Sequence, residues 1–200
     1  MSFTFTEEPH SYHLDGVRLP SVSEIIAPLV DYSMVSMATL AFAATRGKAV
    51  HKACELLDFG ELDEDSVDPR IAGYVDGYRK FLFDFSPLWS IIETPMYHPS
   101  LLYAGTPDRF GVAGGVRAVV DLKSIAAETP AVFVQCSGYD LMVEELGGSG
   151  AEEMWALYLK PDGTYRLRTS TSKRDEQTFL GCLRHYRGKA IIDAWKGRNK

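Results

Sequence analysis

The sequence predicts an α/β fold in which a central mixed β-sheet is flanked by helices. Helix-like segments come early in the chain, strand-like segments gather in its middle, and a helix, a hairpin and a final helix follow. Interleaved elements of this kind bury their apolar faces when helices pack against a sheet. We expect one domain over 1–200, with a lead-in and helix at 1–60, a core at 90–146, and a basic hairpin and C-terminal helix at 151–200.

The first 60 residues predict a strand pair that is followed by helices. Asp15-Gly16 is a strong turn signal between two short strand-like segments. Ser21 or Ser23 can then cap a helix that begins near Glu24, because serine side chains accept hydrogen bonds from the first free backbone N–H groups. A longer helix is expected over 37–57, where apolar residues recur at helical spacing.

A second long helix is predicted to begin at Asp68 and Pro69, which are a good N-cap and a good first-turn residue. Its apolar residues form one stripe, and such a stripe indicates packing against a core. The stripe consists of Ile71, Tyr74, Val75, Tyr78, Leu82 and Phe85.

The middle of the chain reads as strands at 90–96, 101–110 and 116–123, and the last two are separated by a glycine-rich turn. A helix over 131–145 follows. The remaining elements are a hairpin around Pro161-Asp162-Gly163, with strands at 155–160 and 164–168, and a helix over 175–196.

Composition places the chain among ordinary globular proteins. It is 46% hydrophobic and 24% charged, which argues against disorder and coiled coil. No apolar run approaches the ~18 residues of a membrane span. The N-terminus lacks the basic start and apolar stretch of a signal peptide, so a cytoplasmic location and no membrane partner are expected.

Three scattered cysteines, Cys54, Cys136 and Cys182, fit neither a disulfide framework nor an iron–sulfur cluster.

Charge is distributed unevenly along the chain. The net charge of −6 argues against a nucleic-acid partner at first sight, because phosphate binding needs clustered lysine and arginine. However, residues 160–200 hold 11 basic and four acidic residues. This segment is either a solvated basic face or a surface that follows a phosphate backbone. Its candidate DNA-binding residues are Arg166, Arg168, Lys173, Arg174, Arg184 and Arg187.

The strongest chemical signal is a group of charged residues on two neighbouring strands. Asp121 and Lys123 lie two residues apart and therefore share one face of their strand. If the preceding strand pairs with it as a hairpin, Asp108 comes close to Asp121. A divalent cation keeps two adjacent carboxylates ionised, and oxygen ligands favour Mg²⁺ or Mn²⁺ over zinc. The pattern therefore fits metal-dependent phosphoryl chemistry, or a solvated surface pair.

Two helical positions extend this group. Gln135 and Tyr139 lie four residues apart and share one face of the helix after the Asp/Lys strand. His51 lies on the helix over 37–57, where a histidine is either a surface residue or a metal ligand. These residues carry a resemblance to a known family, through Gly47, His51, Glu93, Gly105-Thr106-Pro107-Asp108, Asp121-Leu122-Lys123, Gln135 and Tyr139.

The order of these motifs resembles the RecB-like branch of the PD-(D/E)xK nucleases, which includes phage exonucleases. The resemblance covers residues 10–186 and implies a restriction-endonuclease-like core. It implies that His51, Asp108 and Asp121 bind the metal, and that Lys123 is the catalytic lysine. Gln135 and Tyr139 would orient the site and touch the DNA backbone, and Glu93 would fill an acidic position on the first core strand.

The resemblance implies a Mg²⁺- or Mn²⁺-dependent DNA nuclease without an iron–sulfur cluster, and specifically a phage-type exonuclease in recombination or DNA end processing. A single-strand annealing protein is an expected partner, and a homo-oligomer stays open. Two alternatives also stay open. One is an endonuclease or junction-cleaving nuclease with the same site, and the other is a nuclease-like protein that binds DNA without cutting it.

Overall fold

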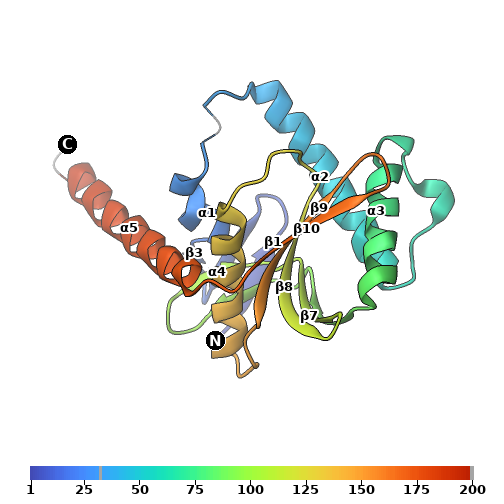
Figure 1. Ribbon diagram of the computed structural model, residues 1–200. Helices are drawn as coiled ribbons and strands as arrows, with labels where there is room; N and C mark the ends of the chain where they lie inside the picture. Colours follow the sequence, from blue (N-terminus) through green and yellow to red (C-terminus); the bar gives the residue numbers. More distant parts are fainter. Residues whose placement is uncertain (32, 199–200) are drawn as a thin grey trace.

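The central element of the computed structural model is a five-stranded mixed sheet (Figure 1). The structure describes residues 1–31 and 33–198. The sheet has the order β10-β9-β8-β7-β4, in which β8 and β9 are parallel and the other neighbours are antiparallel. Its strands are β4 (Leu88–Ile92), β7 (Arg109–Ala113), β8 (Val116–Lys123), β9 (Glu153–Leu159) and β10 (Tyr165–Ser170). The expected mixed sheet flanked by helices is confirmed.

Helices cover both faces of the sheet (Figure 1). On one face, α2 (Met37–Asp58) and α3 (Pro69–Phe85) pack against apolar side chains of β8 that include Val120 and Leu122. On the other face, α4 (Ala131–Glu145) crosses over between the parallel strands β8 and β9 and packs against Val119. The alternation of side chains along β8 therefore buries its apolar residues on two sides.

The N-terminal region forms a small sheet of its own, in the order β1-β2-β3. Its strands are β1 (Phe3–Thr6), β2 (Ser11–Leu14) and β3 (Val17–Leu19). The helix α1 (Val22–Ile26) follows, and Ser21 and Glu24 form a capping box at its start. Of the two serines proposed as its cap, Ser21 is thus the one used. The short 3-10 turns η1 (Ala27–Leu29) and η2 (Glu64–Ser66) complete the helical segments of the first half.

The predicted start of α3 is confirmed, because Asp68 accepts a hydrogen bond from the Arg70 backbone and Pro69 is the first helical residue. The predicted stripe is buried at its first four members, from Ile71 to Tyr78, while Leu82 and Phe85 are only partly buried, and the structure adds the fully buried Phe81 to it. The stripe packs on the sheet as expected.

Two of the predicted strands, 90–96 and 101–110, are wrong in their bounds. β4 ends at Ile92, because Glu93 has a φ of 40° and turns the chain out of the sheet. Two short strands, β5 (Met96–His98) and β6 (Tyr103–Gly105), then pair with each other instead of joining the main sheet. Pro107 separates β6 from β7, since proline has no backbone N–H to donate to a sheet.

The C-terminal elements agree with the predicted helix, hairpin and helix. The last helix, α5 (Lys173–Arg198), buries Phe179 and Leu183 near its start, but its second half extends away from the sheet (Figure 1). The predicted basic segment runs to Lys200, and its residues 199–200 lie outside the described residues. Within the described part of the chain, no helix combines the length and apolar character needed to cross a membrane.

The contact between α4 and α5 depends on a glycine. A Cβ atom placed on Gly138 would lie 2.5 Å from the ring of Phe179, which is fully buried. We expect Gly138→Ala to lower the free energy of unfolding by about 1–3 kcal/mol, because the overpacked ring cannot move aside. Urea unfolding measures this change.

The matched control is Gly181→Ala in α5, where an added Cβ would meet nothing within 4 Å. This change should leave stability unaltered or raise it by up to about 1 kcal/mol, because alanine favours the helix over glycine. Equal effects of the two substitutions would contradict the packing described for Gly138.

Candidate metal centre and cleft

Carboxylates from three neighbouring strands meet at one end of the sheet. Glu93 follows β4, Asp108 precedes β7, and Asp121 lies near the end of β8. The antiparallel register pairs Ile92 with Arg109 and Arg109 with Val120, so the three acidic residues fall at the same level. The Glu93 backbone N–H also donates to the Asp108 carbonyl oxygen at 3.0 Å. Strand pairing therefore gathers the acidic residues in one place.

His51 reaches this end of the sheet from α2. Its Nε2 lies 3.0 Å from the Leu122 carbonyl oxygen, which can only accept a hydrogen bond, so Nε2 carries the proton. Its Nδ1 faces Oε1 of Glu93 at 3.2 Å and Oδ1 of Asp108 at 3.5 Å. One ligand atom from each of these three residues lies within 4.8 Å of the others. A backbone carbonyl that fixes one imidazole nitrogen and directs the other inward is typical of a metal-binding histidine.

Asp121 lies beside this cluster and is 1% exposed at its side chain. Its Oδ2 lies 2.5 Å from Nζ of Lys123 in an ion pair. Neither carboxylate oxygen has a geometrically satisfactory hydrogen bond to any residue within the described ranges. A buried carboxylate without such partners is costly, and a divalent cation is a ligand that would satisfy it. The carboxylates and the imidazole fit a magnesium or manganese ion.

The electrostatics of the site reflect this crowding. Burial raises the pKa of Asp121 to about 6, and Asp108 adds to the effect, although Lys123 opposes it. Burial disfavours the charge on His51, but the carboxylates of Asp108 and Glu93 outweigh it and raise the histidine pKa to about 9. Burial disfavours the charge on Lys123 as well, but the carboxylates of Asp121 and Asp108 outweigh it and raise the pKa of its ammonium group. The carboxylates of the cluster therefore stabilise any positive charge close to them, whether on a side chain or on a metal ion.

Helix α4 places two more of the predicted residues next to Lys123. Nζ of Lys123 lies 3.4 Å from Oε1 of Gln135, whose Nε2 donates to the Tyr139 hydroxyl at 3.0 Å. A Cβ atom on Gly105 would lie 2.7 Å from the Tyr139 ring, so this glycine lets α4 approach the strand before Asp108. All seven residues that the resemblance marks, from His51 to Tyr139, thus gather at one end of the sheet.

Sequence reasoning missed a buried ion-pair network beneath the site. Arg109 is fully buried, and its Nε donates to Asp58 at 2.6 Å while its Nη1 lies 3.2 Å from Glu93. Tyr78 and Trp89 also donate to the Asp58 carboxylate. An arginine within an otherwise apolar strand signals a buried acidic partner. The sequence offered no signal that this partner is Asp58, because it lies 51 residues away.

A cleft of about 660 Å³ opens in front of the cluster. His51, Glu93 and Asp108 line it, together with residues of the N-terminal sheet and of α2. Asp121 and Lys123 are not among its lining residues and lie behind it. A phosphate in the cleft would therefore meet the cluster of His51, Glu93 and Asp108 first.

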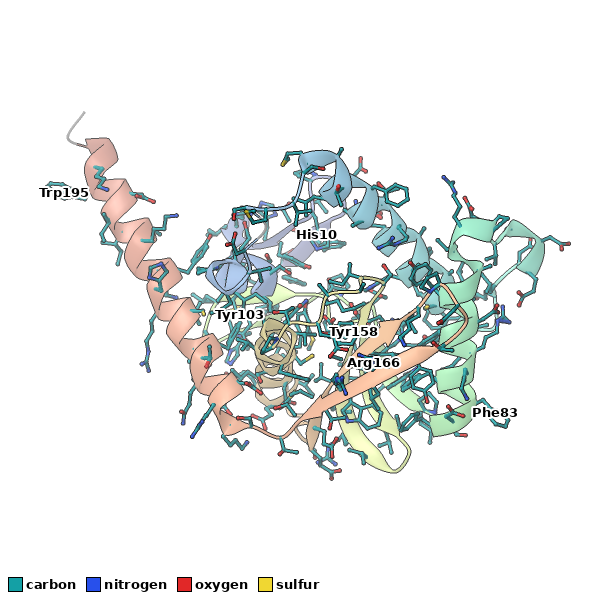
Figure 2. All side chains as sticks on the ribbon, turned by 45° about the horizontal axis from the view of Figure 1, so that its top comes forward. His10, Phe83, Tyr103, Tyr158, Arg166 and Trp195 are labelled. Atoms are coloured by element: carbon teal, nitrogen blue, oxygen red, sulfur yellow. The ribbon has the colours of Figure 1, made fainter. Side chains whose placement is uncertain are left out.

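The predicted DNA-binding arginines and lysines occupy two different places. Arg166, labelled in Figure 2, and Arg168 both lie on β10. Both form ion pairs with Glu128, at 2.7 and 2.8 Å. Lys173 and Arg174 begin α5, after the end of β10 that pairs with the start of β9. That end of the sheet is opposite the one that holds Asp121. The structure thus brings none of these four residues into the cleft.

Comparison with known proteins finds only distant similarity, and it is to solved structures. No family model and no curated protein match the chain. Among solved structures, it is similar to LHK-Exo in complex with dAMP, with 11% identity, 90% of this chain and 93% of that chain covered, and a TM-score of 0.47. A second similar structure is an alkaline exonuclease (LHK-Exo) from Laribacter hongkongensis, with 12% identity, 88% and 93% covered, and a TM-score of 0.40. Chains this distant can share a fold without sharing a site, so the functional assignment depends on the side chains of this protein.

The buried ion pair of Arg109 with Asp58 lies beneath Glu93, and its contribution to stability can be measured. We expect Asp58→Ala to lower the free energy of unfolding by about 3–5 kcal/mol, because the change leaves the Arg109 charge buried without its partner. Urea unfolding followed by circular dichroism measures the loss.

The control is Glu64→Ala, which removes an exposed ion pair with Arg79. It should change the free energy of unfolding by less than about 1 kcal/mol, because water screens exposed pairs. A loss for Asp58→Ala no larger than for this control would show that the buried network does not stabilise the site.

Proposed function

We propose that this chain is a metal-dependent DNA nuclease of the RecB-like branch of the PD-(D/E)xK superfamily, with 1–200 as one nuclease domain. The observation that supports it best is the buried Asp121 beside Lys123, directly behind the cluster of His51, Glu93 and Asp108. The carboxylates of Asp121 and Asp108 are buried close together and repel each other. Titratable groups perturbed in this way are frequent where a protein binds a cation or does chemistry.

The proposed metal is Mg²⁺ or Mn²⁺, and the proposed ligands are His51, Asp108 and Asp121. Glu93, which the structure places within the same compact cluster, joins them. When bound, the cation would lower the pKa of a water molecule and polarise a phosphoryl oxygen of the substrate. The Leu122 backbone supports this set from both sides, since its N–H donates to Asp108 at 2.7 Å and its carbonyl accepts from His51.

Lys123 is the proposed catalytic lysine. Its ammonium group is held between the Asp121 carboxylate and the Gln135 side-chain oxygen, so its position is fixed before any substrate arrives. A preorganised cation of this kind stabilises the negative charge that develops on a phosphate during hydrolysis. Gln135 and Tyr139 act as positioning residues through this contact, because their hydrogen bond fixes the amide that faces Lys123.

The biological setting that we propose is a phage-type exonuclease in recombination or DNA end processing. A single-strand annealing protein is its proposed partner. Gln135, Tyr139 and the basic residues Arg166, Arg168, Lys173 and Arg174 are the proposed DNA contacts, although Glu128 must release the first two arginines before they meet a phosphate.

Substitution at the centre of the site tests the enzyme assignment. Lys123→Ala and Asp121→Asn should each lower the rate of DNA cleavage by at least about 10²-fold, since each removes a preorganised charge from the reaction. Binding of DNA and the circular dichroism spectrum should remain close to those of the unchanged protein.

The matched control is Lys80→Ala, which removes an exposed lysine that pairs with Asp84 on α3, outside the cleft. It should cleave DNA at the unchanged rate. Absence of any cleavage by the unchanged protein with Mg²⁺ or Mn²⁺, on DNA or RNA, would instead favour a nuclease-like protein that only binds.

The form of the substrate tests the exonuclease assignment. End-labelled linear DNA should be degraded with Mg²⁺ or Mn²⁺ and should survive in EDTA, because the proposed reaction needs the divalent cation to lower the pKa of a water molecule and to polarise the phosphoryl oxygen. Covalently closed circular DNA should stay intact under the same conditions. Cleavage of closed circles would show an endonuclease, and cleavage in EDTA would contradict metal dependence.

A further inference from the structure

The cleft has two chemically different walls. Phe5 and His10 line it from the N-terminal sheet, and Lys48 and Lys52 line it from α2. We propose that the cleft binds an unpaired DNA strand, with bases stacked on Phe5 and His10 and phosphates along Lys48. This inference rests on the proposed nuclease function and names the form in which its substrate enters the site.

The ring wall is exposed yet held in place. Phe5 is half-buried and His10 is exposed, and their rings meet edge to face with centroids 4.8 Å apart. Tyr12 lies beneath both, with ring centroids 5.1 Å from Phe5 and 5.3 Å from His10. Aromatic faces of this kind stack on bases of any sequence, because every base has a π-face.

Tyr12 connects the ring wall to the metal centre. Its hydroxyl lies 2.8 Å from Nε2 of His10 and 2.9 Å from Oγ1 of Thr106, which is two residues before Asp108. Tyr12 is 2% exposed, so these contacts are shielded from water. The ring wall is therefore tied to the segment that carries a proposed metal ligand, and a base stacked on it would place its phosphate near that ligand.

The lysine wall lies on the helix that supplies His51. Lys48 and Lys52 are one helical turn apart and both are exposed. Lys52 pairs with Glu55 at 2.9 Å, whereas Lys48 forms no ion pair with any residue that the structure describes. Glu7 also lines the cleft, on the side of the rings. Lys48 therefore attracts phosphates to the α2 side of the cleft, and Glu7 repels them from the ring wall. A nucleotide can then place its phosphate near Lys48 and its base on the rings.

This arrangement favours an unpaired strand. In a duplex, the face of each base is covered by its neighbours, so an aromatic wall gains contact only with bases that have left the stack. A strand with exposed bases can place them on Phe5 and His10 while its backbone follows α2. Figure 2 shows His10 within the N-terminal part of the molecule, on elements other than the β10 strand that carries Arg166.

Fluorescence anisotropy with labelled oligonucleotides in EDTA tests this inference. The probes are single-stranded oligo(dT), the same strand with abasic residues in place of its nucleotides, and a blunt duplex. We expect oligo(dT) to bind about 5- to 100-fold more tightly than the abasic strand, which corresponds to one stacked base. The duplex should bind at the abasic level.

Variants then locate the effect. Phe5→Leu should remove most of the preference for bases and leave abasic binding unchanged, while Phe5→Trp should retain the preference. Lys48→Ala should weaken binding of oligo(dT) and the abasic strand equally, with a salt dependence reduced by about 0.7 in the logarithmic slope. The matched control is Phe3→Leu, since Phe3 stacks on Tyr97 in the same region at 4.9 Å but does not line the cleft.

Equal binding of oligo(dT) and the abasic strand by the unchanged protein would overturn the inference, as would equal losses for Phe5→Leu and Phe3→Leu. A cleavage assay with Mg²⁺ and Mn²⁺ on the same protein separates the two proposals. Cleavage without a preference for bases in binding would contradict the proposed stacking on Phe5 and His10 but would leave the nuclease assignment intact. Base-dependent binding without cleavage on any substrate removes the nuclease assignment and leaves the cleft as a strand-binding site.

Discussion

Several carboxylates are buried at one end of the central sheet, and their mutual repulsion explains how the groups around them are arranged. Glu93, Asp108 and Asp121 repel one another, and burial strengthens that repulsion because little water remains to screen it. Positive groups therefore surround them, with Arg109 beneath Glu93, and with His51 and Lys123 beside the two aspartates. Asp58 holds Arg109 from below. Even so, apart from the ion pair with Lys123, the oxygens of Asp121 have no satisfactory hydrogen bond within the described part of the chain, and a divalent cation would satisfy them.

The need to compensate the buried carboxylates also explains why elements that are distant in sequence contribute residues to the candidate site. Helix α2 supplies His51 and also ends at Asp58, so one helix provides both a group at the cluster and the anchor beneath it. Helix α4 approaches closely enough for Gln135 to contact Lys123, which requires a glycine at position 105. The N-terminal sheet closes one side of the cleft and is joined to the site through Tyr12. A rigid sheet with supporting helices on both faces thus preorganises the charges before any substrate binds.

Much of the fold could be predicted because its elements carry local signals. The alternation along 116–123 gives the bounds of β8, and Asp68 with Pro69 gives the start of α3, since side-chain period and capping act within a few residues. The break after Ile92 could not be predicted in this way. It depends on the left-handed backbone of Glu93 and on the separate pairing of β5 with β6, which are tertiary effects.

The amino-acid sequence alone predicts the α/β class, most of the helices and strands, and a candidate site made of residues from His51 to Tyr139. These follow from local periodicity and from motif order, which the chain carries whatever its three-dimensional arrangement. The three-dimensional arrangement was needed to show that Glu93 joins His51 and Asp108 in the compact cluster, that Asp58 pairs with Arg109, and that Glu128 pairs with two of the basic residues. In the ion pairs of Arg109 with Asp58 and of Glu128 with its two arginines, charges 38 to 51 residues apart in the chain interact through space, so no local pattern encodes them.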